Sequence, residues 1–302
     1  MTTDKFSYQN LRVYEDMIRS FSLAEDMASN WGSVHAISDH FNRASEGALV
    51  CLAEACRTRH DAARNEASDY SLGSILECAA CFDIAECKSL CKREDSLQVK
   101  RALCSVFRQL HALRRSWQAK AVWEMREDKL EYADSYIFNH ERLDAYQLSL
   151  EVVRRIDALR LLDGLPRPGF RRIDEAATSI VLNIAEGNGR FAHLDHGRFI
   201  QIANRSNTKL AARLEMCALR GAINQEEAIT LNRLFVRIDQ MTAKLADAWK
   251  IMKDRGTIDE VRDKVRDKGT NTQIQALSRG EPPHSQKRLI TIMLWKRKTS
   301  LS

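Results

Sequence analysis

The feature that most constrains this 302-residue chain is an internal repeat, which aligns without gaps at a spacing of 132 residues. Leu11 and Tyr14 recur as Leu143 and Tyr146, in the same order and at the same distance. Further identities in this register are Gly32/Gly164, Ala44/Ala176, Ala53-Glu54/Ala185-Glu186, Ser74/Ser206, Ala79-Ala80/Ala211-Ala212, Arg101/Arg233 and Leu113/Leu245. A single register kept over roughly a hundred residues predicts a tandem duplication of one module.

Each copy shows apolar residues at helical spacing in four segments. Only four prolines and twelve glycines occur, which favours long helices over a sheet rich in turns. The predicted helices span about 8–29, 36–57, 67–91 and 95–120 in the first copy, and about 143–162, 171–186, 194–221 and 226–252 in the second. The proline-containing segment 163–169 is expected to interrupt the helical pattern.

Four amphipathic helices with short connections pack as an up-down bundle, so the predicted fold is all-α with two tandem four-helix bundles. The first bundle is assigned to residues 1–120, a charged helical connector to 121–142, the second bundle to 143–252, and a basic, partly disordered tail to 253–302. Residues 251–302 hold 12 basic and 6 acidic residues, whereas the rest of the chain holds 35 of each. The net charge of +6 therefore lies in the tail.

The eight cysteines include the spacings Cys78-x-x-Cys81 and Cys87-x-x-x-Cys91, which are compatible with a zinc site. In the repeat register, however, large apolar residues occupy the positions that correspond to four of them. Cys78, Cys87, Cys91 and Cys104 align with Leu210, Leu219, Ile223 and Val236. A free thiol behaves as a small buried hydrophobe, so we interpret the cluster as core and predict no metal and no cofactor. A metalloenzyme built on Cys78, Cys81, Cys87 and Cys91 stays open as a third hypothesis.

No catalytic constellation is evident, and the sequence predicts a protein that is not an enzyme. The eight histidines are scattered, no phosphate-binding glycine loop follows a strand, and Glu54 and Glu186 are single helical carboxylates. No apolar run approaches the ~20 residues of a membrane span, and the first ten residues are too polar for a secretory signal. We therefore expect a cytoplasmic protein without disulfides and without a membrane partner.

Basic side chains supply the candidate functional surface. On the third helix of the second copy they recur at intervals of seven, four, four and seven residues, which places them on one helical face suited to phosphates. These residues are Arg198, Arg205, Lys209, Arg213 and Arg220, with Arg190 before the helix as an extension. A second candidate contact lies in the tail, at Lys287, Arg288, Trp295, Lys296, Arg297 and Lys298. The alternatives are a solvated helix face and a loose tail.

A more specific motif precedes that helix. The apolar residues Ile180-Val181-Leu182 and Ile184 accompany Asn183, Ala185, Glu186, Gly187 and Gly189, and Arg190 and Phe199-Ile200 follow. It resembles the junction between the second and third helices of the four-helix-bundle proteins encoded in intervening sequences of large-subunit ribosomal RNA. The accessory (Avd) proteins of diversity-generating retroelements are similar to that family. The resemblance covers residues 8–120 and 143–250, although Ala53–Arg57 in the first copy lacks the glycine.

The resemblance implies a homo-oligomer, because single-bundle members form rings, commonly pentamers. It also implies binding of nucleic acid and of a reverse transcriptase through basic surfaces, which map here to Arg190, Arg205, Lys209 and Arg213. The leading hypothesis is a non-enzymatic protein that binds RNA or acts as a scaffold, as an accessory to a reverse transcriptase or as a relative of the ribosomal RNA intervening-sequence proteins. The alternative is a protein–protein adaptor with no role in nucleic-acid binding.

Overall fold

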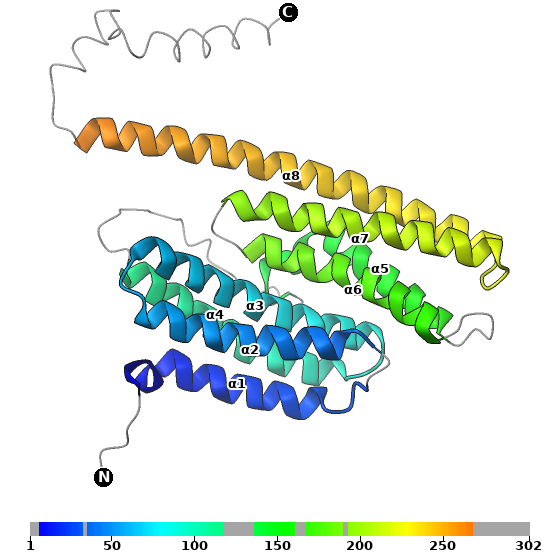
Figure 1. Ribbon diagram of the computed structural model, residues 1–302, viewed down its shortest axis with the longest axis horizontal. Coiled ribbons are helices and arrows are strands. Elements are labelled where there is room, and N and C mark those ends of the chain that lie inside the picture. The colour runs from blue at the N-terminus through cyan, green and yellow to red at the C-terminus, as the bar shows by residue number, and fades with distance from the viewer. Residues whose placement is uncertain (1–5, 33–34, 118–135, 161–166, 190–192, 268–302) are drawn as a thin grey trace, which may run out of the picture. The chain divides into compact units, whose positions relative to one another are not determined.

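The computed structural model describes residues 6–32, 35–117, 136–160, 167–189 and 193–267, and these ranges contain eight α-helices, two short 3-10 helices and no strand (Figure 1). The predicted all-α fold class is confirmed. Residues 1–250 form one compact unit and residues 251–302 a second. None of the described helices combines the length and the apolar composition that crossing a bilayer requires.

The first half of the chain folds as a four-helix bundle. It comprises η1 (Ser7–Asn10), α1 (Arg12–Ala28), α2 (Ile37–Arg57), α3 (Asp61–Cys87) and α4 (Arg93–Trp117). Each helix packs against two others of the half, with α1 and α4 closing the circuit. Trp31, Phe41 and Phe82 form an edge-to-face aromatic cluster in the core, with ring centroids 4.9 to 5.8 Å apart.

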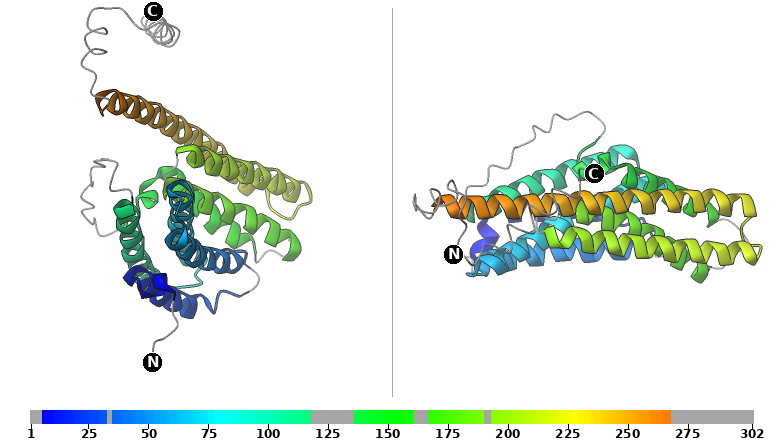
Figure 2. Two further views of the ribbon diagram at one scale, coloured as in Figure 1. Left: turned by 60° about the vertical axis from the view of Figure 1, so that its left-hand side comes forward. Right: turned by 90° about the horizontal axis from the view of Figure 1, so that it is seen from above.

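The second half has the same plan. It comprises η2 (Asn139–Arg142), α5 (Asp144–Leu159), α6 (Arg167–Gly189), α7 (His193–Leu219) and α8 (Gln225–Asp267), of which the part after Lys250 belongs to the second compact unit. Helix α6 packs against α5 and α7. The start of α8 lies beside α7 (Figure 2), where Asn207 Nδ2 donates to the Phe235 carbonyl at 2.8 Å and Thr242 Oγ1 to Asn204 Oδ1 at 2.6 Å.

Secondary-structure bounds recur at the spacing of the sequence repeat. A shift of 132 residues maps η1 onto η2 and α3 onto α7 at both ends, and it maps the first residues of α1 and α4 onto those of α5 and α8. The caps recur as well: the Phe6 N–H donates to Gln9 Oε1 at 2.9 Å, and the equivalent Phe138 N–H donates to Glu141 Oε1 at 3.1 Å. The two halves therefore share local hydrogen bonds as well as helix order.

The helices α3 and α7 also end alike. The N–H of Leu90 donates to the Ala85 carbonyl and that of Ala222 to the Cys217 carbonyl, each at 2.9 Å. Before each donor stands a residue with positive φ, Ser89 at 55° and Gly221 at 69°. This is the hydrogen-bond pattern of a Schellman cap, in which the left-handed residue lets the chain leave the helix.

Some bounds differ from the sequence-based prediction. Helix α3 begins at Asp61, six residues earlier than predicted, because the polar stretch before Ala67 forms its first turns. Helix α6 begins at Arg167 with Pro168 in its first turn. Backbone N–H groups in the first turn have no acceptor within the helix, so a proline there costs no hydrogen bond. The glycines at its other end do not stop it at Glu186, since it continues to Gly189. Residues 137, 138, 140 and 141, assigned to the connector, are buried, whereas 118–135 lie outside the described residues.

The two halves meet where α3 packs against α5 and α6. Helix α3 is apolar on nearly all sides, as expected for a helix enclosed by neighbours. At one end of this joint the buried Lys88 ammonium binds Asp174 Oδ1, while Asp174 Oδ2 accepts the Ala36 N–H at 3.1 Å. Burial and the adjacent Lys88 charge lower the pKa of the His35 imidazole, which lies 3.9 Å from Asp174 and Asp157.

Candidate nucleic-acid interface

Helix α7 carries the predicted basic face. Arg198, Arg205, Lys209 and Arg220 are exposed, and none forms an ion pair with another described residue. The only acidic residue of α7 with a described side chain, Glu215, is exposed as well. Side chains three, four and seven positions apart share one side of a helix, so the cationic groups lie along α7, and no acidic group among the described residues neutralises them. A surface of this kind attracts phosphates without reading base sequence.

Arg213 has a different environment from the other four. It is half-buried, and its Nη1 donates to the backbone carbonyl of Arg172 on α6. Arg213 therefore braces α7 against α6. The same contact brings the exposed Arg172 beside the basic face. Spacing along one helix cannot reveal this residue, because only the packing of α6 on α7 places Arg172 and Arg213 together.

The described residues of the motif before α7, 183–188, hold the end of α6 against α7. Asn183 Nδ2 donates to the Ser179 carbonyl at 2.7 Å, and Ala185 and Gly187 are buried. The Gly187 carbonyl lies 2.5 Å from His196 Nδ1, and since a carbonyl only accepts, the imidazole donates from Nδ1. This bond joins the end of α6 to the first turns of α7. Glu186 is half-buried and takes part in contacts, whereas Arg190 lies outside the described residues.

The equivalent helix of the first half has no such face. The positions of Arg205, Lys209 and Arg213 are occupied in α3 by Gly73, Glu77 and Cys81, and all three are buried or half-buried. The Glu77 carboxylate lies 3.4 Å from His40 Nδ1 on α2. Only the second half presents these cations. The predicted contact residues of the tail, 287–298, lie outside the described residues.

A buried ionic cluster lies at the joint between the halves and was not anticipated from the sequence. Lys100 Nζ, from α4, lies 2.5 Å from Asp83 Oδ1 and 3.4 Å from Glu141 Oε1, and the Tyr146 hydroxyl donates to Asp83 Oδ2 at 2.8 Å. Glu141 also accepts the N–H groups of Ile137 and Phe138. The cluster draws on α3, α4, η2 and α5, so no single segment reveals it.

Burial sets the protonation of this cluster. Burial disfavours the Lys100 ammonium, but the carboxylates of Asp83 and Glu141 outweigh that effect and raise its pKa. Burial and the negative charge of Asp83 raise the pKa of the Glu141 carboxyl. The neighbouring His140 imidazole is fully buried, and desolvation, with the Lys100 charge, lowers its pKa to about 3. At neutral pH His140 is therefore an uncharged ring, stacked on Phe138 with centroids 5.6 Å apart.

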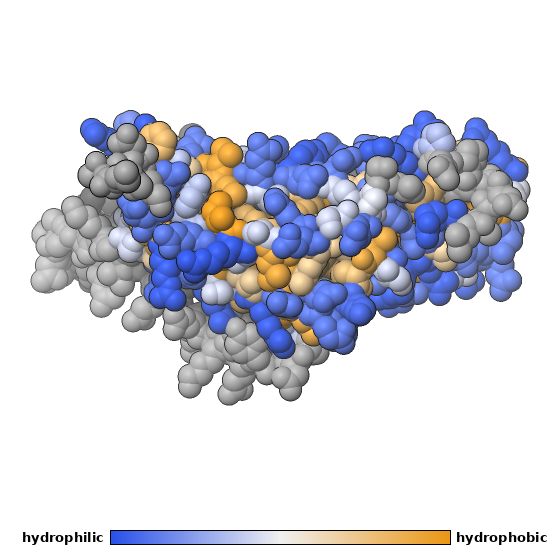
Figure 3. Space-filling model, turned by 90° about the horizontal axis from the view of Figure 1, so that it is seen from below, coloured by the Kyte–Doolittle hydropathy of each residue, from blue (hydrophilic) through white to orange (hydrophobic). Residues whose placement is uncertain are grey.

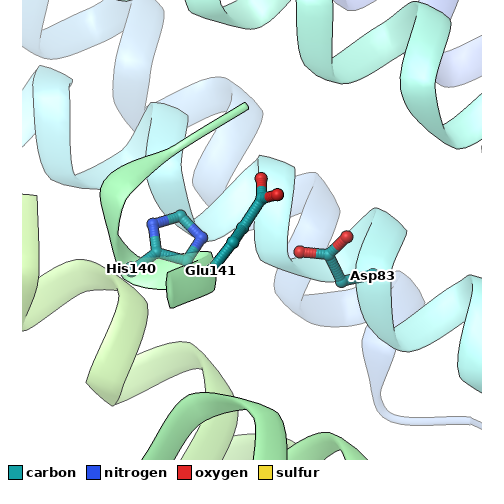
Figure 4. Close-up of side chains that lie close together, drawn as sticks. All are labelled: Asp83, His140 and Glu141. Atoms are coloured by element: carbon teal, nitrogen blue, oxygen red, sulfur yellow. The ribbon is translucent and has the colours of Figure 1, made fainter. Parts of the chain in front are cut away.

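Asp83, His140 and Glu141 together have the donor set of a metal site, with ligand atoms within 4.8 Å of one another (Figure 4). Lys100 Nζ, however, already provides the positive charge between the two carboxylates. A metal ion would have to displace a buried ammonium that is itself hydrogen-bonded. The two carboxylates are therefore explained as members of a structural ion-pair network with Lys100.

The cysteines occupy the core and its margin. Cys78, Cys81 and Cys104 are buried, the other five are half-buried, and all eight are free thiols. Burial raises the pKa of Cys78 and Cys81 well above the ordinary value, and it raises that of Cys87 to about 11 and that of Cys91 to about 12. Metal ligation and nucleophilic attack both require the thiolate, which these environments disfavour.

Comparison with known proteins bears on the half of the chain that contains the basic face. Residues 141–244 match the family model described as 23S rRNA-intervening sequence protein. The match supports the predicted resemblance for η2, α5, α6, α7 and the start of α8, and it is compatible with an RNA-related helical protein. Searches of curated proteins and of solved structures found no match.

Proposed function

We propose that the protein is a non-enzymatic, helical RNA-binding scaffold whose contact with RNA is made by the basic face of α7. The observation that supports this most directly is the row of exposed, unpaired cations at Arg198, Arg205 and Lys209, within the residues that match the 23S rRNA-intervening sequence family model. Such contacts neutralise phosphates and release counterions, so the affinity depends on salt.

Charge reversal on the exposed face tests the proposal. In Arg198→Glu/Arg205→Glu/Lys209→Glu, we expect the affinity for a structured RNA to fall by more than tenfold, and the slope of log K against log salt to become shallower by about 2 to 3. Fluorescence anisotropy over a salt series measures both quantities. Arg213 is left intact because it braces α6.

A matched control reverses three exposed basic residues elsewhere, Lys92, Arg101 and Arg142, and changes the net charge by the same amount. This variant is expected to keep most of the affinity and nearly all of the salt slope. Equal losses in the two triple variants would show that only the overall charge matters, and the assignment to α7 would be wrong.

The resemblance also supports narrower proposals. One is that the protein acts as an accessory to a reverse transcriptase, an enzyme that itself uses RNA as a template. An origin by tandem duplication is supported by helix bounds, caps and positive-φ residues that recur at 132. A cytoplasmic location fits eight free thiols, since reducing compartments keep cysteines unpaired.

The second candidate is a protein–protein adaptor, and exposed apolar side chains on α7 and α8 favour it. Met216, Leu219 and Val236 lie on the surface of the described unit, where a soluble partner or another chain could cover them. Under this alternative, the same proteins are captured from a lysate with and without nuclease treatment, and the affinity for RNA is negligible. Under the RNA-binding proposal, nuclease releases what is captured.

A further inference from the structure

The basic face of α7 is bordered by two uncharged polar side chains, Asn183 on α6 and Thr208 on α7 itself. Each uses its N–H or O–H donor within the protein and keeps an oxygen that can only accept. An exposed cation binds a phosphate whatever the sugar, whereas an accepting oxygen requires a donor on the ligand. These two oxygens therefore bear on which nucleic acid the face selects.

The amide of Asn183 is held in one orientation. Its Nδ2 donates to the Ser179 carbonyl at 2.7 Å and to Ser179 Oγ at 3.2 Å, so the nitrogen is turned toward Ser179 and Oδ1 away from it. A flipped amide would lose the first bond, because a carbonyl only accepts. No described group donates to Asn183 Oδ1, and this atom is not among the polar atoms that are buried without a partner. It therefore faces solvent as a fixed acceptor.

The packing of α6 on α7 places Asn183 beside the cations. Two contacts show that these helices run antiparallel, one on each side of Asn183 along α6. They join Ser179 Oγ to Ser206 Oγ at 2.9 Å, and the Gly187 carbonyl to His196 Nδ1 at 2.5 Å. Asn183 lies halfway between the two contacts on α6, and the corresponding part of α7 is flanked by Arg198 and Arg205. The amide oxygen is thus level with these two guanidinium groups.

Thr208 lies on the other side of the same row of cations. It is two residues from Ser206, which faces α6, and two residues correspond to about 200° around a helix. Thr208 is exposed, three positions after Arg205 and one before Lys209. Its Oγ1 donates to the Asn204 carbonyl at 3.0 Å, so the hydroxyl hydrogen is used and the oxygen can only accept.

The first half has neither acceptor. The equivalent of Asn183 is Cys51, and the equivalent of Thr208 is the buried Leu76. Seen from the α1 side, the molecule presents apolar side chains gathered in a band between hydrophilic margins (Figure 3). Exposed apolar residues of α1 and α2 include Ile18 and Val50. In the repeat, therefore, the two acceptors occur only in the copy that carries the cations.

We propose that Asn183 and Thr208 accept hydrogen bonds from ribose 2′-hydroxyl groups, so that the basic face of α7 selects RNA over DNA. The inference rests on the proposed function, because the cations must first bind the phosphates. Phosphates offer only acceptors, and the 2′-hydroxyl is the donor that every nucleotide of RNA carries on the same backbone. DNA would bring phosphates to the cations and leave both oxygens with no donor except water.

Three ligands that share one hairpin sequence separate the hydroxyl from charge and shape. They are RNA, the same RNA with fluorine in place of every 2′-hydroxyl, and the corresponding DNA. The 2′-fluoro RNA keeps the charge and the A-form geometry but has no 2′-hydroxyl donor. Wild type is expected to bind RNA at least about tenfold more tightly than 2′-fluoro RNA or DNA, because two hydrogen bonds are lost. Fluorescence anisotropy measures the three dissociation constants.

The variant Asn183→Leu/Thr208→Val removes both oxygens and keeps the net charge and the approximate size of each side chain. Its affinity for RNA should fall about tenfold, to that for 2′-fluoro RNA, while the salt slope stays as in wild type because no cation is removed. Thr208→Val alone, at an exposed site, should lower RNA affinity about fivefold, and Thr208→Ser, which keeps a hydroxyl, should retain it. Circular dichroism checks that each variant is folded.

A matched control makes the same two exchanges on α2 and α8, as Asn42→Leu/Thr230→Val, and should keep the full preference for RNA. Equal affinity of wild type for RNA and 2′-fluoro RNA, or a preference that survives in both Asn183→Leu/Thr208→Val and Thr208→Val, would overturn the inference. Neither result would affect phosphate binding by the cations, because Arg198→Glu/Arg205→Glu/Lys209→Glu should weaken binding of all three ligands alike. Absence of RNA binding by wild type would overturn both proposals.

Discussion

Helices α3 and α7 have equivalent bounds, Asp61–Cys87 and His193–Leu219. They differ in how many neighbouring helices pack against them. Helix α3 packs against α2, α4, α5 and α6, and its buried residues are mostly small or apolar, with the buried Asp83 neutralised by Lys100. Helix α7 is covered by α6 and α8 and presents cations on the remaining side. The two helices have the same length and equivalent bounds, so the difference in residue types follows from how many neighbouring helices cover each one.

The largest expected difference between the halves is in the free energy of unfolding, when Lys100 and its equivalent Asn232 are each replaced. Lys100→Met leaves the buried carboxylates of Asp83 and Glu141 facing each other, which should lower the free energy of unfolding by about 3 to 5 kcal/mol. Asn232→Met, at an exposed position, should change it by less than about 0.5 kcal/mol. Urea denaturation measures both free energies of unfolding.

A triple variant, Lys100→Met/Asp83→Asn/Glu141→Gln, serves as the control, because it removes the charges together. Much of the lost stability should return in it. If Lys100→Met cost no more than Asn232→Met, the cluster would not stabilise the joint between the halves.

A smaller effect is expected from His140 and its equivalent Tyr8, and it depends on pH. The pKa of His140 is about 3 in the folded protein and about 6.5 in the unfolded chain, so between these values only the unfolded chain binds the proton. The contribution of uncharged His140 to the free energy of unfolding is therefore fully present above pH 6.5. It is lost as the pH falls, by up to about 1.4 kcal/mol per pH unit. His140→Phe should remove that slope.

Comparing the two proteins from pH 7 to pH 5 by denaturation isolates His140, since Glu141, whose raised pKa acts in the opposite sense, is common to both. Tyr8→Phe should leave the slope of the wild type unchanged. A slope that survives His140→Phe would mean that another group takes up the proton.

The smallest effect concerns the matched caps at Ser89 and Gly221. Ser89 has a φ of 55°, a conformation that costs a side chain energy and glycine little, so Ser89→Gly should stabilise the protein by up to about 1 kcal/mol. Gly221→Ser should destabilise it by about 1 kcal/mol through backbone strain alone, because no atom lies within 4 Å of the added Cβ. Opposite signs of the two shifts in thermal midpoint would confirm that the caps are equivalent. Shifts of the same sign would contradict it.

The fold class and most helices could be predicted from the sequence, because apolar spacing reflects the short-range period of a helix and the repeat indicates the same helices twice. The start of α3 differs from the prediction, because Asp61 and Arg64 lie in polar sequence without apolar spacing and nevertheless form its first helical turns. The basic face of α7 was predictable from spacing on one helix. The Lys100 cluster and the addition of Arg172 were not, since both depend on which helix faces which.

The contacts of Lys88, Lys100 and Asp174 across the joint have a consequence for how such a chain is built. Two polypeptides cut between residues 117 and 136 would retain every one of these bonds, so the fragments are expected to reassociate when expressed together. The covalent link then matters chiefly for stoichiometry, because it guarantees one first half for every second half. A cationic surface on α7 and an enclosed helix α3 are therefore always present in equal numbers.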